Sequence, residues 1–318
     1  MNRTVVILLS DKRSGSTMLQ EELCKHPDIQ HVAYSPHTYF ETHHWLKAAV
    51  LLGMPPQTFY GHRVYPGYGS KKNARTYLID CVKRNVPDFA VPADDRELVF
   101  QGWEALCDTF AKPVFFEKSP QHLAQWAALS LMLEWIEQTN FRVRVIGLVR
   151  NPHGVLASAS KLFLTDPERR QFGWADMHRN LLVFRAMLTD DAFHLFRYED
   201  ILADPARCFQ HILQFIGVSE HSHVGESVRG SSLEKWRQDQ RYWIQLHETV
   251  CQTAAHFGYT REELDSRRKI PPTRSRRLMM ACRRFAARQQ ARLVNGLAKP
   301  IALRIRAGRR GQGPASAE

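Results

Sequence analysis

The sequence predicts an α/β protein built on a doubly wound, mainly parallel sheet with helices on both faces. Short apolar runs of strand length alternate along the chain with longer segments of helical periodicity. Each run is followed directly by polar residues, and we therefore expect a ligand site beyond the carboxyl ends of the strands. The predicted strands are residues 5–9, 112–118, 142–149 and 193–196.

The first strand leads into a polar loop that reads Arg13-Ser14-Gly15-Ser16-Thr17, and a helical pattern follows. Backbone N–H groups at the start of a helix lack intrahelical partners, and with the helix dipole they favour a phosphate or sulfate. Gly15 lets the backbone approach the anion, and Arg13 adds a fixed positive charge. The hydroxyls of Ser16 and Thr17 can donate hydrogen bonds. The arrangement predicts a P-loop-like anion site.

The loop departs from the phosphate loop of ordinary nucleotidases, Gly-x-x-x-x-Gly-Lys-Ser/Thr. The first glycine and the Gly-Lys pair are missing, and only the hydroxyl residue after them is shared. A P-loop kinase or ATPase is therefore the disfavoured alternative.

Helical periodicity and capping signals predict the helices between these strands. Pro120 should open one of them, because proline is favoured in a first helical turn. The segment 31–75 is rich in His, Tyr, Pro and Gly, and we expect it to cover a site. The predicted helices are residues 18–23, 45–52, 73–85, 103–110, 120–136, 152–163, 174–188, 205–216 and 233–257.

Length and composition are those of an ordinary globular protein. With 318 residues, 44% of them hydrophobic and 24% charged, the chain can bury a substantial core. No apolar stretch approaches the roughly 20 residues that span a bilayer, and the first apolar run is too short for a signal-peptide core. We expect a cytoplasmic protein.

Cysteine and histidine spacings argue against a metal site. The six cysteines are scattered without a Cys-x-x-Cys pair, and the fifteen histidines include no His-Glu-x-x-His pattern. We expect free thiols and no metal.

The net charge of +12 resides in the C-terminal tail. Residues 267–317 hold thirteen Arg, two Lys and no acid, which leaves 29 basic and 31 acidic residues in 1–266. We predict a domain over 1–266 and a basic tail over 267–318, partly helical or disordered. A solvated tail is the plainest expectation, and weak contact with an anionic membrane surface is second. Specific nucleic-acid binding is disfavoured, because aromatic residues are scarce there.

Four polar clusters should converge at one edge of the sheet, since the carboxyl ends of parallel strands meet there. Together they supply several cations, as a polyanionic ligand needs. Ser158 follows Arg150 by eight residues and falls on the same helical face. The clusters are residues 13–17, 117–120, 150–152 and 197–200.

These motifs resemble those of sulfotransferases that use 3′-phosphoadenosine 5′-phosphosulfate (PAPS). The loop at 13–17 resembles the 5′-phosphosulfate loop, and 149–152 with Ala157-Ser158 resembles the 3′-phosphate motif. Residues 196–201, followed by Asp204-Pro205 and Phe215-Ile216-Gly217, are similar to another stretch of the family. The resemblance covers roughly residues 4–245, and the ordered set of motifs makes it specific. It implies that 1–266 is a sulfotransferase domain.

The resemblance implies a role for each cofactor-binding position. Arg13 and residues 14–17 would hold the 5′-phosphosulfate, and Arg150 with Ser158 would hold the 3′-phosphate. Tyr198 would lie near the nucleotide, and Lys235 would reach its phosphates. Plain structural alternatives remain for three of them: an ion pair for Arg150, helix packing for Tyr198 and a solvated helix face for Lys235.

Lys118 resembles the lysine of Lys-x-Pro motifs in related enzymes, which offsets charge on the bridging oxygen as the sulfuryl group departs. A solvated strand end is its structural alternative. Related enzymes often place a glutamate after a His-Pro-Asp-Ile-like stretch, and Glu41 is the first carboxylate after it here. Glu41 would take the proton from the acceptor hydroxyl, with His37 or His122 as the alternatives.

Transfer of a sulfuryl group to the hydroxyl of a sugar, phenol or natural product is the function that this resemblance implies. Segments 31–75 and 160–175 would shape the acceptor pocket. The second hypothesis is a binding protein whose basic tail engages nucleic acid or membrane while the body is catalytically idle.

Overall fold

The computed structural model describes residues 3–59, 62–63, 70–230, 233–239 and 242–266, together with isolated positions between 273 and 289. The strands are β1 (Thr4–Ser10), β2 (Ile29–Gln30), β3 (Thr58–Phe59), β4 (His62–Arg63), β5 (Val114–Lys118), β6 (Arg142–Val149) and β7 (Phe193–Arg197). The α-helices are α1 (Ser16–Leu23), α2 (His44–Leu51), α3 (Lys71–Asn85), α4 (Asp95–Phe110), α5 (Trp126–Gln138), α6 (Pro152–Phe163), α7 (Pro167–Ala186), α8 (Tyr198–Ala203), α9 (Pro205–Ile216), α10 (Lys235–Gln238) and α11 (Glu248–Ala255). Two 3₁₀ turns, η1 (Thr38–Phe40) and η2 (His122–Ala124), complete the described elements.

The central sheet has the strand order β2-β5-β1-β6-β7, and all of its neighbouring strands are parallel. In the register of its middle strands, Leu8 lies opposite Lys118 on one side and Ile146 on the other. A separate two-stranded antiparallel pair joins β3 and β4. The predicted doubly wound α/β architecture is confirmed.

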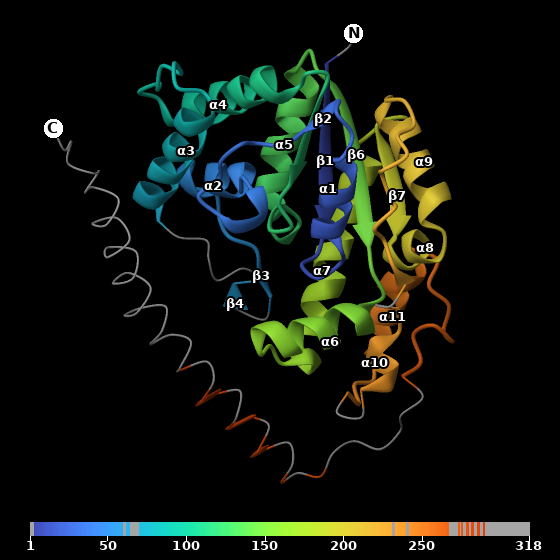
Figure 1. Ribbon diagram of the computed structural model, residues 1–318. Coiled ribbons are helices and arrows are strands. Elements are labelled where there is room, and N and C mark those ends of the chain that lie inside the picture. The colour runs from blue at the N-terminus through green and yellow to red at the C-terminus, as the bar shows by residue number, and fades with distance from the viewer. Residues whose placement is uncertain are drawn as a thin grey trace, which may run out of the picture.

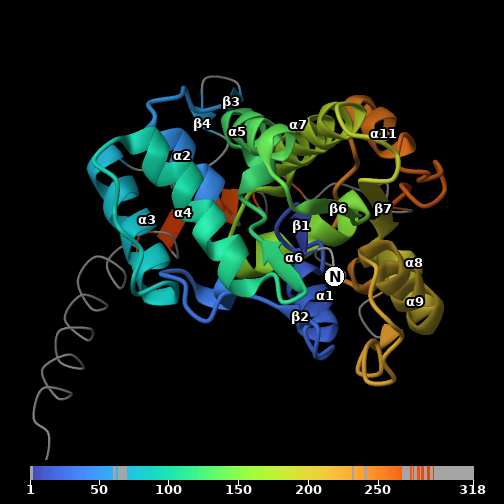
Figure 2. The same ribbon diagram turned by 90° about the horizontal axis from the view of Figure 1, so that it is seen from above.

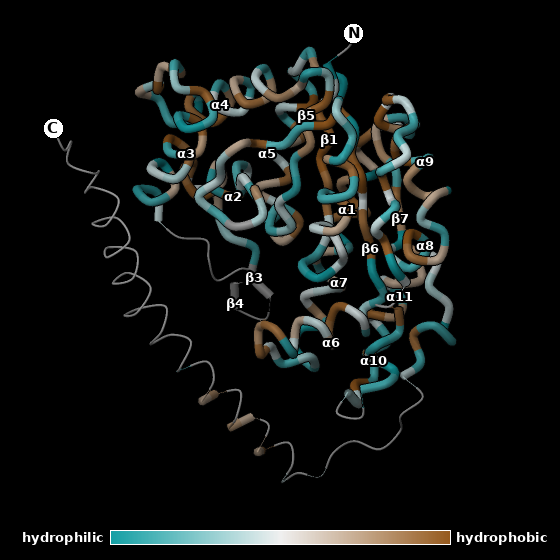
Figure 3. Tube along the Cα trace, viewed as in Figure 1, coloured by the Kyte–Doolittle hydropathy of each residue, from teal (hydrophilic) through white to brown (hydrophobic). Residues whose placement is uncertain are grey.

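Helices cover both faces of the sheet, as Figures 1 and 2 show. Alternate residues of β1 point to opposite faces: Val5, Ile7 and Leu9 join the core shared with α2–α5, α7 and α11. Val6 and Leu8 join the core shared with α1, α8 and α9. All seven residues of β1 are buried, which explains its continuous apolar run, and Figure 3 shows the hydrophobic colour concentrated on β1 and β6.

The four longer strands lie where they were predicted, whereas the short strands β2, β3 and β4 were not predicted and four helices differ. The helices predicted over 103–110 and 174–188 begin earlier, at Asp95 and Pro167. The helix expected from Pro120 begins instead at Trp126, because residues 120–125 form a turn and the η2 segment. The helix expected over 233–257 is divided into α10 and α11, and the described residues 242–247 between them are non-helical.

Tertiary contacts explain this interruption. The hydroxyl of Tyr242 lies 2.8 Å from His153 Nδ1, and the backbone N–H of His247 donates to Gln171 Oε1 at 2.8 Å. These partners are on α6 and α7. The segment is therefore anchored by contacts that compete with continuous helix formation.

The predicted basic tail falls largely outside the described residues. Its described positions between 275 and 289 are helical, and Leu278, Met279 and Phe285 are exposed. Among the described helices, none combines the length and the apolar character needed to cross a bilayer.

Candidate active site

The loop after β1 adopts the turn that an anion site requires. Gly15 caps α1 with a left-handed φ of 97°, and the N–H of Ser14 donates to the carbonyl of Asp11 at 3.2 Å. A Cβ on Gly15 would lie 2.4 Å from the ring of Tyr198. Glycine is therefore required here for its backbone conformation and for the close approach of an aromatic ring.

The base of the loop is held by a buried ion pair. Asp11 is 1% exposed, and Arg170 from α7 bonds both of its carboxylate oxygens. This contact ties the first strand to α7, and it fixes where the loop leaves the sheet.

Arg13, Arg150 and Ser158 come together on one side of the sheet. Nε of Arg13 donates to Ser158 Oγ at 2.9 Å, and Arg150 Nη1 donates to the carbonyl of Arg13 at 2.9 Å. The guanidinium of Arg150 also lies 4.4 Å from the centroid of the Tyr198 ring. The ring of Tyr198 thus contacts both the loop glycine and a cation. Tyr198 therefore packs against its surroundings and also lies next to the loop, so the two alternatives expected for it do not exclude each other.

A cavity of about 360 Å³ lies between the loop and the start of α6. Its described lining includes four cationic side chains, Arg13, Arg150, Lys161 and Lys235, and no carboxylate. Such a lining favours an anionic ligand. Of the nine positions expected to bind the cofactor, eight line this cavity: Arg13, Gly15, Ser16, Thr17, Arg150, Ser158, Tyr198 and Lys235.

Ser14 is the ninth, and it is not part of the cavity lining. It is completely buried, and its Oγ makes no hydrogen bond to any described residue. Its contribution to an anion would therefore come from the backbone.

Lys118 connects the loop to a second group of side chains. It ends β5 and is completely buried, so the solvated alternative does not apply to it. Its Nζ lies 3.0 Å from Glu41 Oε1 and 3.4 Å from Thr17 Oγ1. One cation thus bridges the anion-binding loop and a buried carboxylate.

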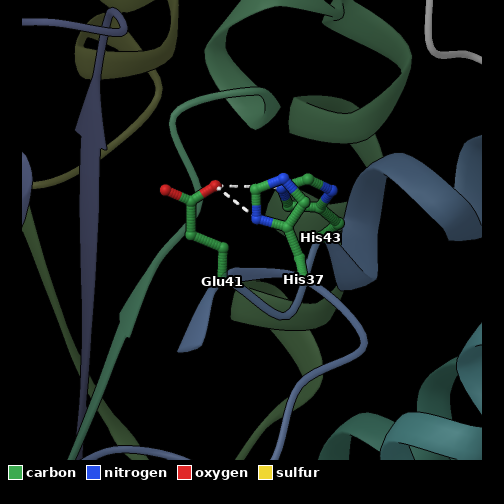
Figure 4. Close-up of side chains that lie close together, drawn as sticks. All are labelled: His37, Glu41 and His43. Carbon is green, nitrogen blue, oxygen red and sulfur yellow. Dashed lines mark hydrogen bonds and ion pairs between the residues drawn. The ribbon is translucent and has the colours of Figure 1, made fainter. Parts of the chain in front are cut away.

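Glu41 is surrounded by nitrogen donors at its other oxygen. His43 Nε2 lies 3.1 Å from Oε2, His37 Nδ1 lies 3.3 Å from it, and Gln121 Nε2 donates to it at 3.2 Å. Figure 4 shows the two imidazoles side by side, facing the same carboxylate. The structure therefore brings two of the three candidate bases, Glu41 and His37, into contact.

Burial alone would raise the pKa of Glu41, but the hydrogen bond from His43 and the charge of Lys118 outweigh it. The net effect lowers the pKa of Glu41 to about 2. Burial lowers the pKa of His43 to about 4 despite its hydrogen bond to Glu41. A carboxylate and a neutral imidazole are therefore the forms at neutral pH.

His122, the third candidate base, is completely buried on η2. Burial and the neighbouring His43 and His44 lower its pKa well below the usual value. The position is unfavourable for contact with an acceptor hydroxyl.

Sequence reasoning missed the network beneath Glu41. Glu117 is 1% exposed and accepts hydrogen bonds from Thr42 Oγ1, at 2.9 Å, and from Ser119 Oγ. Ser119 Oγ in turn accepts from the N–H of His43 at 3.0 Å. Burial raises the pKa of Glu117 to about 7, although both hydrogen bonds lower it. The only sequence signal was the position of Glu117 and Ser119 on either side of Lys118.

A parallel α/β sheet with an anion-binding loop at its first strand and a cationic cavity beside it defines a P-loop-like α/β protein. The sulfotransferase family model matches residues 6–222, about two thirds of the chain. The protein belongs to the sulfotransferase family.

Two solved structures have the same fold. The sulfotransferase domain of the Synechococcus PCC 7002 olefin synthase is 18% identical, with a TM-score of 0.53, and the match covers 81% of this chain and 96% of that domain. The sulfotransferase domain from the curacin biosynthetic pathway is also 18% identical with a TM-score of 0.53, over 82% of this chain and 99% of that domain. A search of curated protein sequences finds no significant match.

Proposed function

We propose that the protein transfers a sulfuryl group from 3′-phosphoadenosine 5′-phosphosulfate to a hydroxyl of a sugar or small natural product. The observation that carries the proposal is the meeting of Arg13, Arg150 and Ser158 beside the loop, in a cavity lined by cations. The donor molecule carries an anionic group at each end of its adenosine. It therefore needs two sets of cationic and hydroxyl groups within reach of one nucleotide.

In this proposal the 5′-phosphosulfate binds the loop, through the backbone N–H groups at the start of α1 and the hydroxyls of Ser16 and Thr17. Arg150 and Ser158 bind the 3′-phosphate. Lys235 is an exposed residue of the cavity lining and would reach the phosphates. The contacts between Arg13, Arg150 and Ser158 keep these donors in place before the nucleotide binds.

The chemistry is an in-line displacement at sulfur. The acceptor oxygen forms the new S–O bond while the bond from sulfur to the bridging oxygen breaks, and adenosine 3′,5′-bisphosphate leaves with that electron pair. Lys118 is suited to stabilise the bridging oxygen, because its Nζ already touches Thr17 of the loop. Glu41 takes the proton of the acceptor hydroxyl and later releases it to water.

Glu41 is the preferred proton acceptor because it contacts Lys118, which also contacts the loop. Its low pKa keeps it unprotonated, and the approach of the acceptor and movement of Lys118 toward the donor would raise its basicity. His37, which lies beside the same oxygen, is the second candidate. The effects of Glu41→Gln and His37→Ala on kcat distinguish which of the two residues takes the proton.

All six cysteines are free thiols, which supports a reducing, cytoplasmic compartment. The tail 267–318 would make weak contact with an anionic membrane surface, because its charge is almost entirely positive.

Calorimetry with adenosine 3′,5′-bisphosphate and with ATP tests the donor site directly. We expect the bisphosphate to bind and ATP to bind much more weakly. Incubation with the labelled sulfuryl donor and a panel of hydroxyl acceptors then tests transfer, with mass spectrometry to detect the gain of one SO₃ group. Tight binding of ATP without binding of the bisphosphate would replace this proposal with a kinase.

A further inference from the structure

The His37–Glu41–His43 cluster has the composition of a metal site. Two imidazole nitrogens and one carboxylate oxygen lie within 4.8 Å of one another. The nitrogens of His37 and His43 are 3.3 Å and 3.1 Å from Glu41 Oε2 (Figure 4). Ligand atoms bound at about 2.0–2.2 Å around a tetrahedral ion are roughly 3.3–3.5 Å apart, so only small shifts would be needed.

Surrounding contacts hold two of the three ligands in place. His43 is 2% exposed, its N–H donates to Ser119 Oγ at 3.0 Å, and its ring stacks on Tyr77 with an interplanar angle of 11°. Ser35 Oγ donates to the carbonyl of Glu41. Such supporting contacts are what a metal site needs, since each ligand must keep its orientation when the ion arrives.

His37 provides access from solvent. Its side chain is 37% exposed, whereas that of Glu41 is 8% exposed and that of His43 is 3% exposed. An ion could therefore reach the carboxylate from the side of His37 without disturbing the sheet or the anion-binding loop.

Gln121 offers a fourth ligand. Its Nε2 donates to Glu41 Oε2 at 3.2 Å, while its buried Oε1 makes no hydrogen bond to any described residue. A buried acceptor without a partner destabilises the folded state, because it has lost its hydrogen bonds to water. Rotation of the amide by half a turn would bring this oxygen to the position beside Glu41, where an ion could satisfy it.

We propose that His37, Glu41 and His43 bind a divalent transition-metal ion, that their two nitrogens and one oxygen suit Zn²⁺ best, and that the bound ion blocks Glu41. Imidazole and carboxylate ligands are those that Zn²⁺ prefers. The ion would occupy the side of the carboxylate that faces solvent, where the acceptor hydroxyl has to approach. This inhibitory part rests on the proposed function, and the binding part does not.

Lys118 makes the ion exchangeable. It contacts Oε1, the other oxygen of the same carboxylate, so a cation already lies next to the site. Its repulsion lowers the affinity for a second cation without competing for the same oxygen. The site is thus an inhibitory one that responds to the free Zn²⁺ concentration.

The binding test uses the full-length chain after dialysis against a chelator. Binding of ZnCl₂ is measured by calorimetry. Binding of CoCl₂ is followed by visible absorption, whose intensity reports tetrahedral coordination of the ion. We expect His37→Ala and Glu41→Gln to weaken binding at least tenfold, with circular dichroism to verify that both variants are folded. His223→Ala is the matched control, because His223 also lies beside a carboxylate, that of Glu226, but on the exposed surface.

Unchanged Zn²⁺ affinity in both His37→Ala and Glu41→Gln would overturn the proposed site. Once an acceptor is known, Zn²⁺ should inhibit turnover of the wild-type chain, and a chelator should restore it. Turnover that persists at saturating Zn²⁺ would overturn the inhibitory part. Zn²⁺ binding that depends on His37, without transfer to any acceptor, would support the metal site and remove only the proposed function.

Discussion

The ammonium of Lys118 lies 3.0 Å from Glu41 Oε1, and both side chains are withdrawn from solvent. The pair joins the end of β5 to the segment that precedes α2. Because Lys118 Nζ also lies 3.4 Å from Thr17 Oγ1, it links the start of α1 to the carboxylate. The first two predictions concern this pair.

Replacing Lys118 with methionine should reduce kcat by about 10²–10³, the usual cost of removing one preorganised donor to a developing negative charge. The change also removes the cationic partner of the buried Glu41 carboxylate, which keeps its contacts with His43 and Gln121, and this costs about 3–5 kcal/mol of unfolding free energy. Urea denaturation and initial-rate kinetics measure the two effects. Adding Glu41→Gln to Lys118→Met should restore part of the unfolding free energy but none of the turnover rate. Near-normal turnover of the Lys118→Met enzyme would exclude the lysine from the mechanism.

The two candidate proton acceptors give different results when replaced. Glu41→Gln should lower kcat by about 10²–10⁴ if Glu41 takes the proton, which is the usual contribution of a general base. His37→Ala should then lower kcat only a few-fold, because His37 merely contacts the carboxylate. The reverse order of the two effects, measured under saturating donor and acceptor, would assign the proton to His37.

Arg150→Ala should weaken binding of adenosine 3′,5′-bisphosphate by about 10–100-fold, the loss expected for a charge-assisted hydrogen bond of about 1.5–3 kcal/mol. Binding of adenosine 5′-monophosphate, which lacks the 3′-phosphate, should change much less. Calorimetry measures both. Arg207→Ala, which removes an exposed arginine on α9, is the control and should leave both affinities unchanged. An equal loss for both nucleotides would mean that Arg150 does not read the 3′-phosphate.

Gly15→Ala should destabilise the protein by more than about 1 kcal/mol, because a non-glycine residue at positive φ is strained. Its Cβ would also meet the Tyr198 ring at 2.4 Å. Gly173→Ala on α7 is the control, since its Cβ would meet only the end of Arg170 at 3.4 Å. The two Gly→Ala variants are compared by urea denaturation. Part of the cost is the clash between the new Cβ and the Tyr198 ring. The effects of Gly15→Ala and Tyr198→Ala on the unfolding free energy should therefore be non-additive in the double variant. Strict additivity would contradict the contact.

The raised pKa of Glu117 predicts that its contribution to the unfolding free energy decreases as the pH rises. Its folded pKa, about 7, lies above the reference value of 4.5, so the folded state binds the extra proton between these values. The stabilisation is complete below pH 4.5 and is lost as the pH rises through 7. Glu117→Gln should flatten this part of the profile and be more stable than wild type at pH 8.

Unfolding followed from pH 4.5 to 8 measures this effect. Glu97→Gln, at the exposed start of α4, is the control and should follow the wild-type profile. Glu41 contributes in the opposite sense: its stabilisation is present above pH 4.5 and disappears as the pH falls toward 2.

Local sequence was sufficient for the four longer strands, most of the helices and the turn that follows β1. The run Arg142–Val149 is a strand over the predicted residues, and Asn151-Pro152 and Gly217 bound α6 and α9 as their capping signals indicate. These features depend on periodicity and on single residues with strong backbone preferences. Because the carboxyl ends of parallel strands meet at one edge of the sheet, chain order alone was enough to predict that Arg13 and Arg150 lie close together.

Other features depended on contacts between distant parts of the chain. The interruption between α10 and α11 follows from partners on α6 and α7, which no local pattern contains. The contact of Tyr198 with Gly15 joins residues that are distant in sequence. The nitrogens around Glu41 come from the segment before α2 and from the turn after β5. His37 could be named as a candidate from the sequence, but neither its contact with Glu41 nor the involvement of His43 could be predicted from local pattern.

By itself, the sequence determined a parallel α/β sheet, the glycine turn after its first strand and the cations that gather beside that turn, because these follow from periodicity and chain order. Only the tertiary structure decided the electrostatic state of the carboxylates. Glu41 and Glu117 are the same amino acid, yet one has a pKa of about 2 and the other of about 7. The difference comes from burial and from the neighbours that folding places around each group, and these do not exist in the extended chain.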